Sequence, residues 1–215
     1  MHWIDSAYLP EKKGTLDRFL LNPHGDADGL LLTDGMEVHF PPHMSRPVVA
    51  AFKSGDKVKI RGVRPRGTEM VAAVSLEAAD GKQIIDLGPS EEPHGRGHGK
   101  GHASDASEPM DVEGVVQRVL HGPKGETRGA LLEDGRIVRI RPHTADLLHE
   151  LLAHGKKLAA RGEGLTNALG TVLDANEIGV SLANLLPVEP KKAQQHGEHK
   201  HGKHGGHEKK HAPSA

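Results

Sequence analysis

Residues 14–43, GTLDRFLLNPHGDADGLLLTDGMEVHFPPH, contain the pattern that decides the fold, because residues 114–143 repeat it without a gap. The second stretch reads GVVQRVLHGPKGETRGALLEDGRIVRIRPH, and 13 of the 30 aligned positions are identical. Self-similarity at a fixed offset indicates a duplicated structural unit. We therefore expect two related domains, at residues 14–87 and 111–183, joined by a flexible His/Gly-rich and acidic linker at 88–110.

The composition of the 215-residue chain excludes several classes of protein. Hydrophobic residues make up 35% and aromatic residues 2%, which disfavours a single large core. Lys and Arg total 28 against 29 Asp and Glu, so a uniformly basic nucleic-acid wrapper is excluded. The absence of cysteine excludes disulfides, thiolate metal sites and a cysteine nucleophile. Without a signal pattern or an apolar run of about 18 residues, we expect a cytoplasmic protein with no membrane partner.

Within the first copy, hydrophobic periodicity predicts five strands and one short helix. The helix is expected to begin at Ser45 as its N-cap and to end before Gly55. A second helix is expected at Thr144–Ala153 of the other copy. The expected elements of the first copy, in order, are strands Gly14–Leu21, Gly29–Thr33 and Met36–Phe40, the helix Ser45–Lys53, and strands Lys57–Val63 and Glu69–Leu76.

Asp34-Gly35 between two apolar runs predicts a β-hairpin, and Asp134-Gly135 predicts the same in the second copy. A two-residue turn places Leu31 opposite Val38, which gives an inner face of Leu31, Met36, Val38 and Phe40. The outer face of the second copy then carries Ala130, Leu132, Ile137, Arg139 and Arg141. A three-residue turn would reverse this assignment. Alternatively, Leu32 and Leu132 seal the back of the sheet or the interface between the two domains.

The order strand, strand, strand, helix, strand, strand in about 70 residues resembles the OB-fold. The spacing GxLLxDGxxV followed by PH is similar to the small OB-like domains of uncharacterised bacterial proteins. The resemblance implies a mainly β protein with two tandem five-stranded barrels, each with a helix between its third and fourth strands. It also implies a binding face on the second and third strands of each barrel, flanked by loops.

Basic residues gather on the fourth strand of the first copy and the loop after it. Such a stripe can follow a phosphate backbone, although a solvated strand face explains it equally well. The candidate contacts for nucleic acid or a protein partner are Lys57, Lys59, Arg61, Arg64 and Arg66, with His39, Arg139 and Arg141 on the outer sheet faces.

Residues 189–215 are rich in His and Lys and have no apolar periodicity, so we expect a disordered tail. The tail is similar to the histidine-rich tails of bacterial nickel and zinc accessory proteins, which implies loose binding of Ni or Zn in vitro. Its candidate ligands are His196, His199, His201, His204, His207 and His211.

No arrangement of residues resembles a nucleophile elbow, a phosphate loop or a zinc-protease helix, so we expect no enzymatic activity and no required cofactor. The leading hypothesis is a binding protein for single-stranded nucleic acid or a protein partner. The alternative is a metal-handling protein whose tail carries the function.

Overall fold

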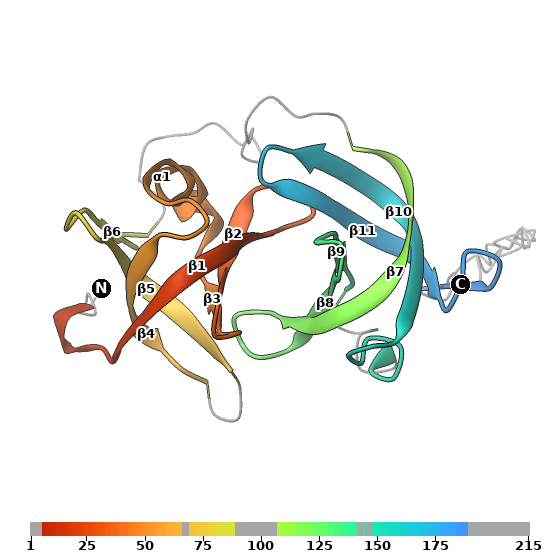
Figure 1. The fold of residues 1–215 in the computed structure, drawn as a ribbon, viewed down its shortest axis with the longest axis horizontal. Helices are drawn as coiled ribbons and strands as arrows, with labels where there is room; N and C mark the ends of the chain where they lie inside the picture. Colours follow the sequence, from red (N-terminus) through yellow and green to blue (C-terminus); the bar gives the residue numbers. More distant parts are fainter. Residues whose placement is uncertain (1–5, 66–68, 89–106, 142–143, 145–147, 189–215) are drawn as a thin grey trace, which may run out of the picture.

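Two closed β-barrels lie side by side in the computed structural model (Figure 1), which describes residues 6–65, 69–88, 107–141, 144 and 148–188. The first barrel comprises η1 (Ser6–Tyr8), β1 (Glu11–Leu21), β2 (Ala27–Leu32), β3 (Glu37–His39), η2 (Pro42–Met44), α1 (Ser45–Ala51), β4 (Lys57–Val63), β5 (Met70–Ala78) and β6 (Gln83–Ile85). The second comprises β7 (Glu108–His121), β8 (Thr127–Leu132), β9 (Ile137–Arg139), β10 (Lys157–Asn167), β11 (Gly170–Gly179) and β12 (Leu185–Pro187).

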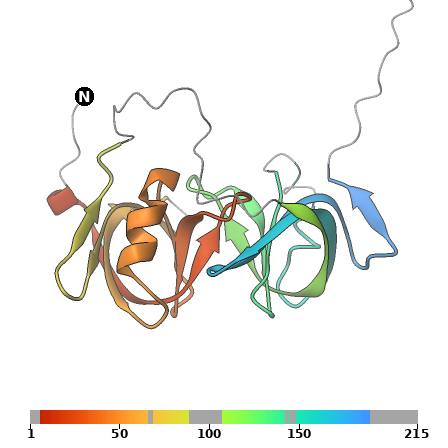
Figure 2. The same ribbon diagram turned by 90° about the horizontal axis from the view of Figure 1, so that it is seen from above.

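Both barrels have the strand order that the resemblance implies. In the first, the order β3-β2-β1-β4-β5 is closed by parallel pairing of β3 with β5. In the second, β9 pairs in parallel with β11 and closes the equivalent ring. A short sixth strand extends each sheet, and Figure 2 shows these strands, β6 and β12, at opposite ends of the molecule. The tandem five-stranded OB-like architecture predicted from the sequence is therefore confirmed.

The hairpin turn after β2 has three residues rather than two, which corrects the predicted register. Leu30 pairs with Val38, and the Leu32 N–H donates to the Met36 carbonyl. Gly35 adopts a φ of +87°, as the last residue of a three-residue hairpin loop commonly does. A shift of one position reverses the faces of a strand. Leu30 and Leu32 consequently lie in the barrel core, and Leu31 points outward.

The second hairpin shows the same correction. Ala130 and Leu132 pack in the core of the second barrel with Val138. Leu131 and Ile137 lie on the outer face and are buried against the first barrel. The outer face predicted for this copy therefore loses Ala130 and Leu132.

The helix predicted in the first copy forms as α1, but Ser45 does not cap it. Met44 is the N-cap, and Ser45 is buried with its hydroxyl accepting a hydrogen bond from the Ala27 N–H at 3.0 Å. The side chain thus fixes the helix against β2. Of the helix predicted at 144–153, residues 145–147 lie outside the described residues. Thr144 is helical, Leu148 has 3-10 conformation, and residues 149–155 form turns and bends.

The described elements extend slightly beyond the expected domains, since β1 begins at Glu11, β7 at Glu108, and β12 ends at Pro187. Most of the expected linker and all of the expected tail, residues 89–106 and 189–215, lie outside the described residues. Among the residues that the structure describes, none of the helices is long and apolar enough to span a membrane.

The barrels share a hydrophobic interface. Leu131, Ile137 and Val172 of the second barrel belong to the same buried cluster as the core of the first. The contacts across the interface are reciprocal. Arg118 of the second barrel lies close to Gly35 of the first, since a Cβ on Gly35 would be 3.3 Å from its Nη1. Arg18 of the first barrel lies equally close to Gly135 of the second, where the corresponding distance is 3.0 Å. The copies therefore meet approximately as the subunits of an isologous dimer do.

Candidate functional site

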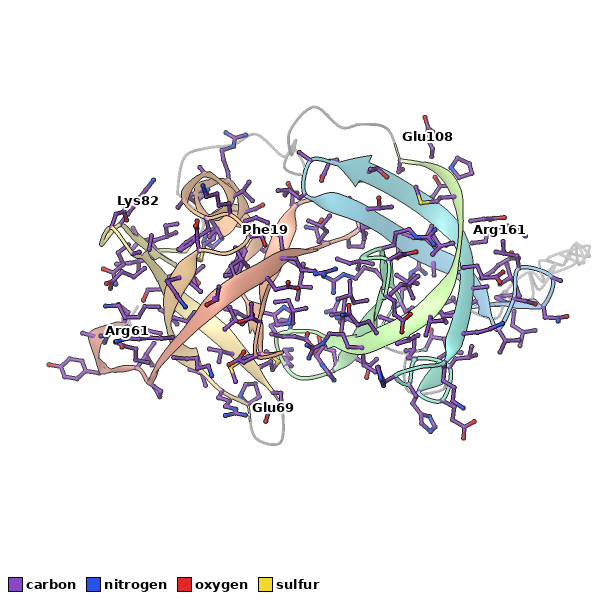
Figure 3. All side chains as sticks on the ribbon, viewed as in Figure 1. Phe19, Arg61, Glu69, Lys82, Glu108 and Arg161 are labelled. Carbon is purple, nitrogen blue, oxygen red and sulfur yellow. The ribbon has the colours of Figure 1, made fainter. Side chains whose placement is uncertain are left out.

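The predicted basic stripe lies on the outer surface of the first barrel. Lys57, Lys59 and Arg61 alternate along β4 with the buried Val58 and Ile60, so their side chains share the solvent face. Lys13 on β1 is opposite Lys59 in the register. We call Lys13, Lys57, Lys59 and Arg61 the lysine face. Figure 3 shows Arg61 at the end of the molecule far from the second barrel.

A groove of about 450 Å³ runs over this surface, lined by Lys13, Lys57, Lys59, Thr15 and Glu77 among others. Its cations have local partners. Lys59 forms an ion pair with Glu77, and Lys57 Nζ donates to Thr15 Oγ1 at 2.9 Å. The Lys59–Glu77 pair is partly exposed and the Lys57 interaction is exposed, so they reduce the positive field of the groove without removing it.

Arg61 connects the lysine face to an exposed aromatic residue. Its guanidinium donates to Glu11 Oε2 at 2.7 Å and to the Ala7 carbonyl at 2.8 Å. The next residue, Tyr8, is 88% exposed. The proximity of Tyr8 to the lysine face depends on contact between η1 and β4, and the sequence contains no local signal for it.

Of the other two predicted residues of the stripe, the structure describes only Arg64. Arg64 forms an ion pair with Glu69 at 2.6 Å, and both side chains are exposed. Arg66 lies outside the described residues.

Arg139 is placed in the interface between the barrels, where it is 5% exposed. Its Nε donates to the Leu21 carbonyl at 2.6 Å, and its Nη2 donates to Asp28 Oδ1 at 2.8 Å. Both partners belong to the first barrel. Arg139 therefore joins the two barrels and does not form part of an open outer face.

His39 is also buried, at 4% exposed, and takes part in a polar cluster around Glu37. Glu37 is 1% exposed and accepts hydrogen bonds from the backbone N–H and the Nδ1 of His121, both at 2.9 Å. His39 Nε2 lies 3.3 Å from Oε2, the oxygen that also accepts from the His121 backbone N–H. The cluster links β3 of the first barrel to β7 of the second.

The cluster shifts the pKa values of its members in opposite directions. Burial acts to raise the pKa of Glu37, but hydrogen bonds from His121 and His39 outweigh it and lower that pKa from 4.5 to about 2. The hydrogen bond to Glu37 raises the pKa of His121 above 6.5, against the effect of its burial. The charged forms of both groups are thus favoured across the interface.

A larger cleft, of about 610 Å³, opens where the two copies meet. Its walls include equivalent positions from each copy, namely Pro23 and Pro123, His39 and Arg139, and Phe40 and Ile140. Arg141, expected on the outer sheet face, also lines this cleft. The structure therefore brings His39, Arg139 and Arg141 to one place, and it leaves Lys57, Lys59 and Arg61 on another.

The predicted metal ligands of the tail, His196 to His211, lie outside the described residues. Within the part of the chain that the structure describes, there is no group of three or more His, Asp or Glu side chains that could hold a metal ion.

The sequence interpretation missed Glu37, His121 and Tyr8. One signal was present for Glu37, because it occupies the position at which the second copy has the apolar Ile137. A carboxylate at a buried position needs hydrogen-bond partners. Its partner could not be named, because His121 is 84 residues away.

Comparison with known proteins gives only distant matches. No family model matches the chain, and no curated protein does. The single-stranded DNA binding protein from Thermus aquaticus matches as a wild-type crystal structure, with a TM-score of 0.26 and 15% identity over 78% of this chain and 89% of that chain. A deletion mutant of the same protein matches with a TM-score of 0.26 and 16% identity, over 82% of this chain and 95% of that chain. These values are too low to transfer a function.

Proposed function

We propose that this protein binds single-stranded nucleic acid through the first of its two tandem OB-like barrels and does not catalyse a reaction. The observation that supports this function best is the lysine face of the first barrel, where Arg61 is bonded to the residue before the exposed Tyr8. Binding of single strands without sequence preference combines a cationic groove with an aromatic surface on which a base can stack.

The geometry suits a phosphate backbone more than a series of bases. Lys57 and Lys59 are two residues apart on one strand face, roughly 6.6 Å along the strand. Lys13 lies beside them on β1, which widens the cationic strip to two strands. A single flexible strand can place successive phosphates along such a strip, and Tyr8 can stack with one base.

The ion pairs of the face predict modest affinity. Glu77 and Glu11 already compensate Lys59 and Arg61, so a phosphate must compete with carboxylates that are held on neighbouring strands. We therefore expect weak, sequence-tolerant binding that depends steeply on salt concentration, because counterion release dominates it.

The test is fluorescence anisotropy of a labelled oligothymidylate at low salt. Measurements use the full chain and a chain ending at Val188, which retains every described element and removes the charged tail. Changing Lys57, Lys59 and Arg61 to Ala should weaken binding and flatten the slope of log K against log salt by up to about one unit for each phosphate that is no longer neutralised. Tyr8→Ala should weaken binding with little change in that slope.

The second barrel offers a matched control. Arg161 occupies the position equivalent to Arg61 and pairs with Asp111 at 2.8 Å, and Lys157 is equivalent to Lys57. Changing Lys157 and Arg161 to Ala should leave affinity unchanged. The proposal fails if the chain shows no binding at tens of micromolar, or if the triple substitution on the first barrel has no more effect than this control.

A further inference from the structure

The cleft between the barrels is too large to be a packing defect. Its volume is about 610 Å³, whereas protein interiors contain few voids larger than a water molecule. Sites for small ligands are concave, have volumes of about 300–1,000 Å³ and are largely preformed. The cleft has that size, and residues of both copies line it.

One wall of the cleft is cationic because the two copies differ at equivalent positions. The second copy places Arg128 and Arg141 where the first has Asp28 and Pro41. Asp28 is already bound to Arg139 at 2.8 Å within the interface. The positive side chains that face the open cleft therefore come from the second barrel.

Arg128 keeps donor capacity for a ligand. Its Nε and Nη2 both lie 3.0 Å from Glu126 Oε1, and 42% of its side chain is exposed. A guanidinium has five N–H donors, so a single carboxylate oxygen does not use them all. The contact with Glu126 also fixes the orientation of the planar group, which lowers the cost of ordering it when an anion binds.

The remaining lining is mostly apolar. Pro23, Phe40, Pro123 and Ile140 contribute the paired walls, and Val63 at the end of β4 is 52% exposed. An exposed valine beside rigid proline rings provides a surface for an apolar body. These apolar side chains offer no hydrogen-bond partner to a polar ligand body.

We propose that this cleft binds a compact organic anion, with its anionic group at Arg128 and Arg141 and its apolar body against Val63, Pro23 and Phe40. The ligand class is an aromatic or aliphatic ring system that carries one carboxylate, sulfonate or phosphate group. The site is separate from the lysine face, and the proposal does not depend on nucleic-acid binding.

An acidic residue, Asp174, also lines the cleft. Its carboxyl lines the cleft near Arg141, and burial raises its pKa although Arg141 and His24 act to lower it. A second anion beside Asp174 would be repelled when that group is ionised.

The test uses 8-anilinonaphthalene-1-sulfonate, a fluorescent probe that combines an apolar ring system with one anionic group. Titration of the full chain should show saturable enhancement at one site. Changing Arg128 and Arg141 to Gln should raise the Kd on the order of tenfold or more, as expected for the loss of charge-assisted hydrogen bonds. N-phenyl-1-naphthylamine, which lacks the sulfonate, should be almost unaffected by the same change.

Two further variants give the proposal its controls. Arg136→Gln removes a guanidinium that pairs with Asp134 on the same barrel but lies outside the cleft lining, so it should not alter the Kd. Ala72→Trp places a large ring in the cleft from β5 and should prevent binding, while circular dichroism confirms the fold.

Three results would overturn the proposal: enhancement that does not saturate, a Kd that Arg128 and Arg141 do not affect, or undiminished binding to the Ala72→Trp chain. The triple Ala variant of Lys57, Lys59 and Arg61 should bind the probe normally. Probe binding by this variant distinguishes failure of the cleft proposal from failure of the nucleic-acid proposal.

Discussion

Replacement of Glu37 by Gln tests whether the polar cluster holds the two barrels together. The carboxylate is almost fully buried and accepts two hydrogen bonds from His121 of the other barrel. The lowering of its pKa from 4.5 to about 2 corresponds to about 3 kcal/mol in favour of the charged form in the folded protein, at 1.36 kcal/mol per pKa unit. We expect Glu37→Gln to lower the free energy of unfolding by roughly 2–3 kcal/mol near pH 5.5.

The effect should depend on pH because both partners titrate. The pKa of Glu37 is lowered, so its contribution is complete above pH 4.5 and is lost as pH falls toward 2. The pKa of His121 is raised, so its contribution is complete below pH 6.5 and is lost as pH rises through the raised value. The difference between the wild type and Glu37→Gln should therefore be largest between pH 4.5 and 6.5 and smaller at pH 9.

Urea unfolding followed by far-UV circular dichroism measures the change, and an NMR titration of His121 reports its pKa in both proteins. Glu77→Gln is the matched control, because Glu77 pairs with Lys59 on the exposed face and its loss should cost less than about 1 kcal/mol. The reasoning is refuted if Glu37→Gln costs no more than this control. It is also refuted if the His121 pKa is the same with and without the carboxylate.

Two other predictions concern the tail and the independence of the barrels. Calorimetry should detect Ni or Zn binding that is abolished by truncation after Val188 and weakens below about pH 6, where histidines protonate; unchanged stoichiometry after truncation would contradict the tail assignment. Residues 6–88 and 107–188, expressed separately, should each fold, because each barrel closes its own sheet. Each fragment should nevertheless have a lower melting temperature than the full chain, because separation exposes interface residues such as Leu31 and Leu131. Unfolded fragments would contradict the expected independent folding. Melting temperatures equal to that of the full chain would contradict the stabilising role of the interface.

The duplication and the strand order were readable from the sequence because they depend on local chemistry. Alternation of apolar and polar residues along Lys57–Val63 reports burial of one strand face, and this pattern is the same in any tertiary context. Asp34-Gly35 likewise predicts a hairpin. The length of its loop was not determined, since a turn of two or three residues is compatible with the same dipeptide. This difference of one residue in loop length decided whether Leu31 or Leu32 points into the core of the barrel.

Only the tertiary structure decided what the outward-facing residues contact. Arg139 and Leu21 are 118 residues apart, and His121 and Glu37 are 84 residues apart. Periodicity assigns His39 and Arg139 to an outer face, but it cannot show that a second barrel covers that face. In the same way, the sequence indicated a row of basic residues on β4, whereas Glu11, Glu77 and the Ala7 carbonyl reach that row from other elements. The face of a strand follows from the local repeat of two residues, whereas its environment depends on how distant segments pack.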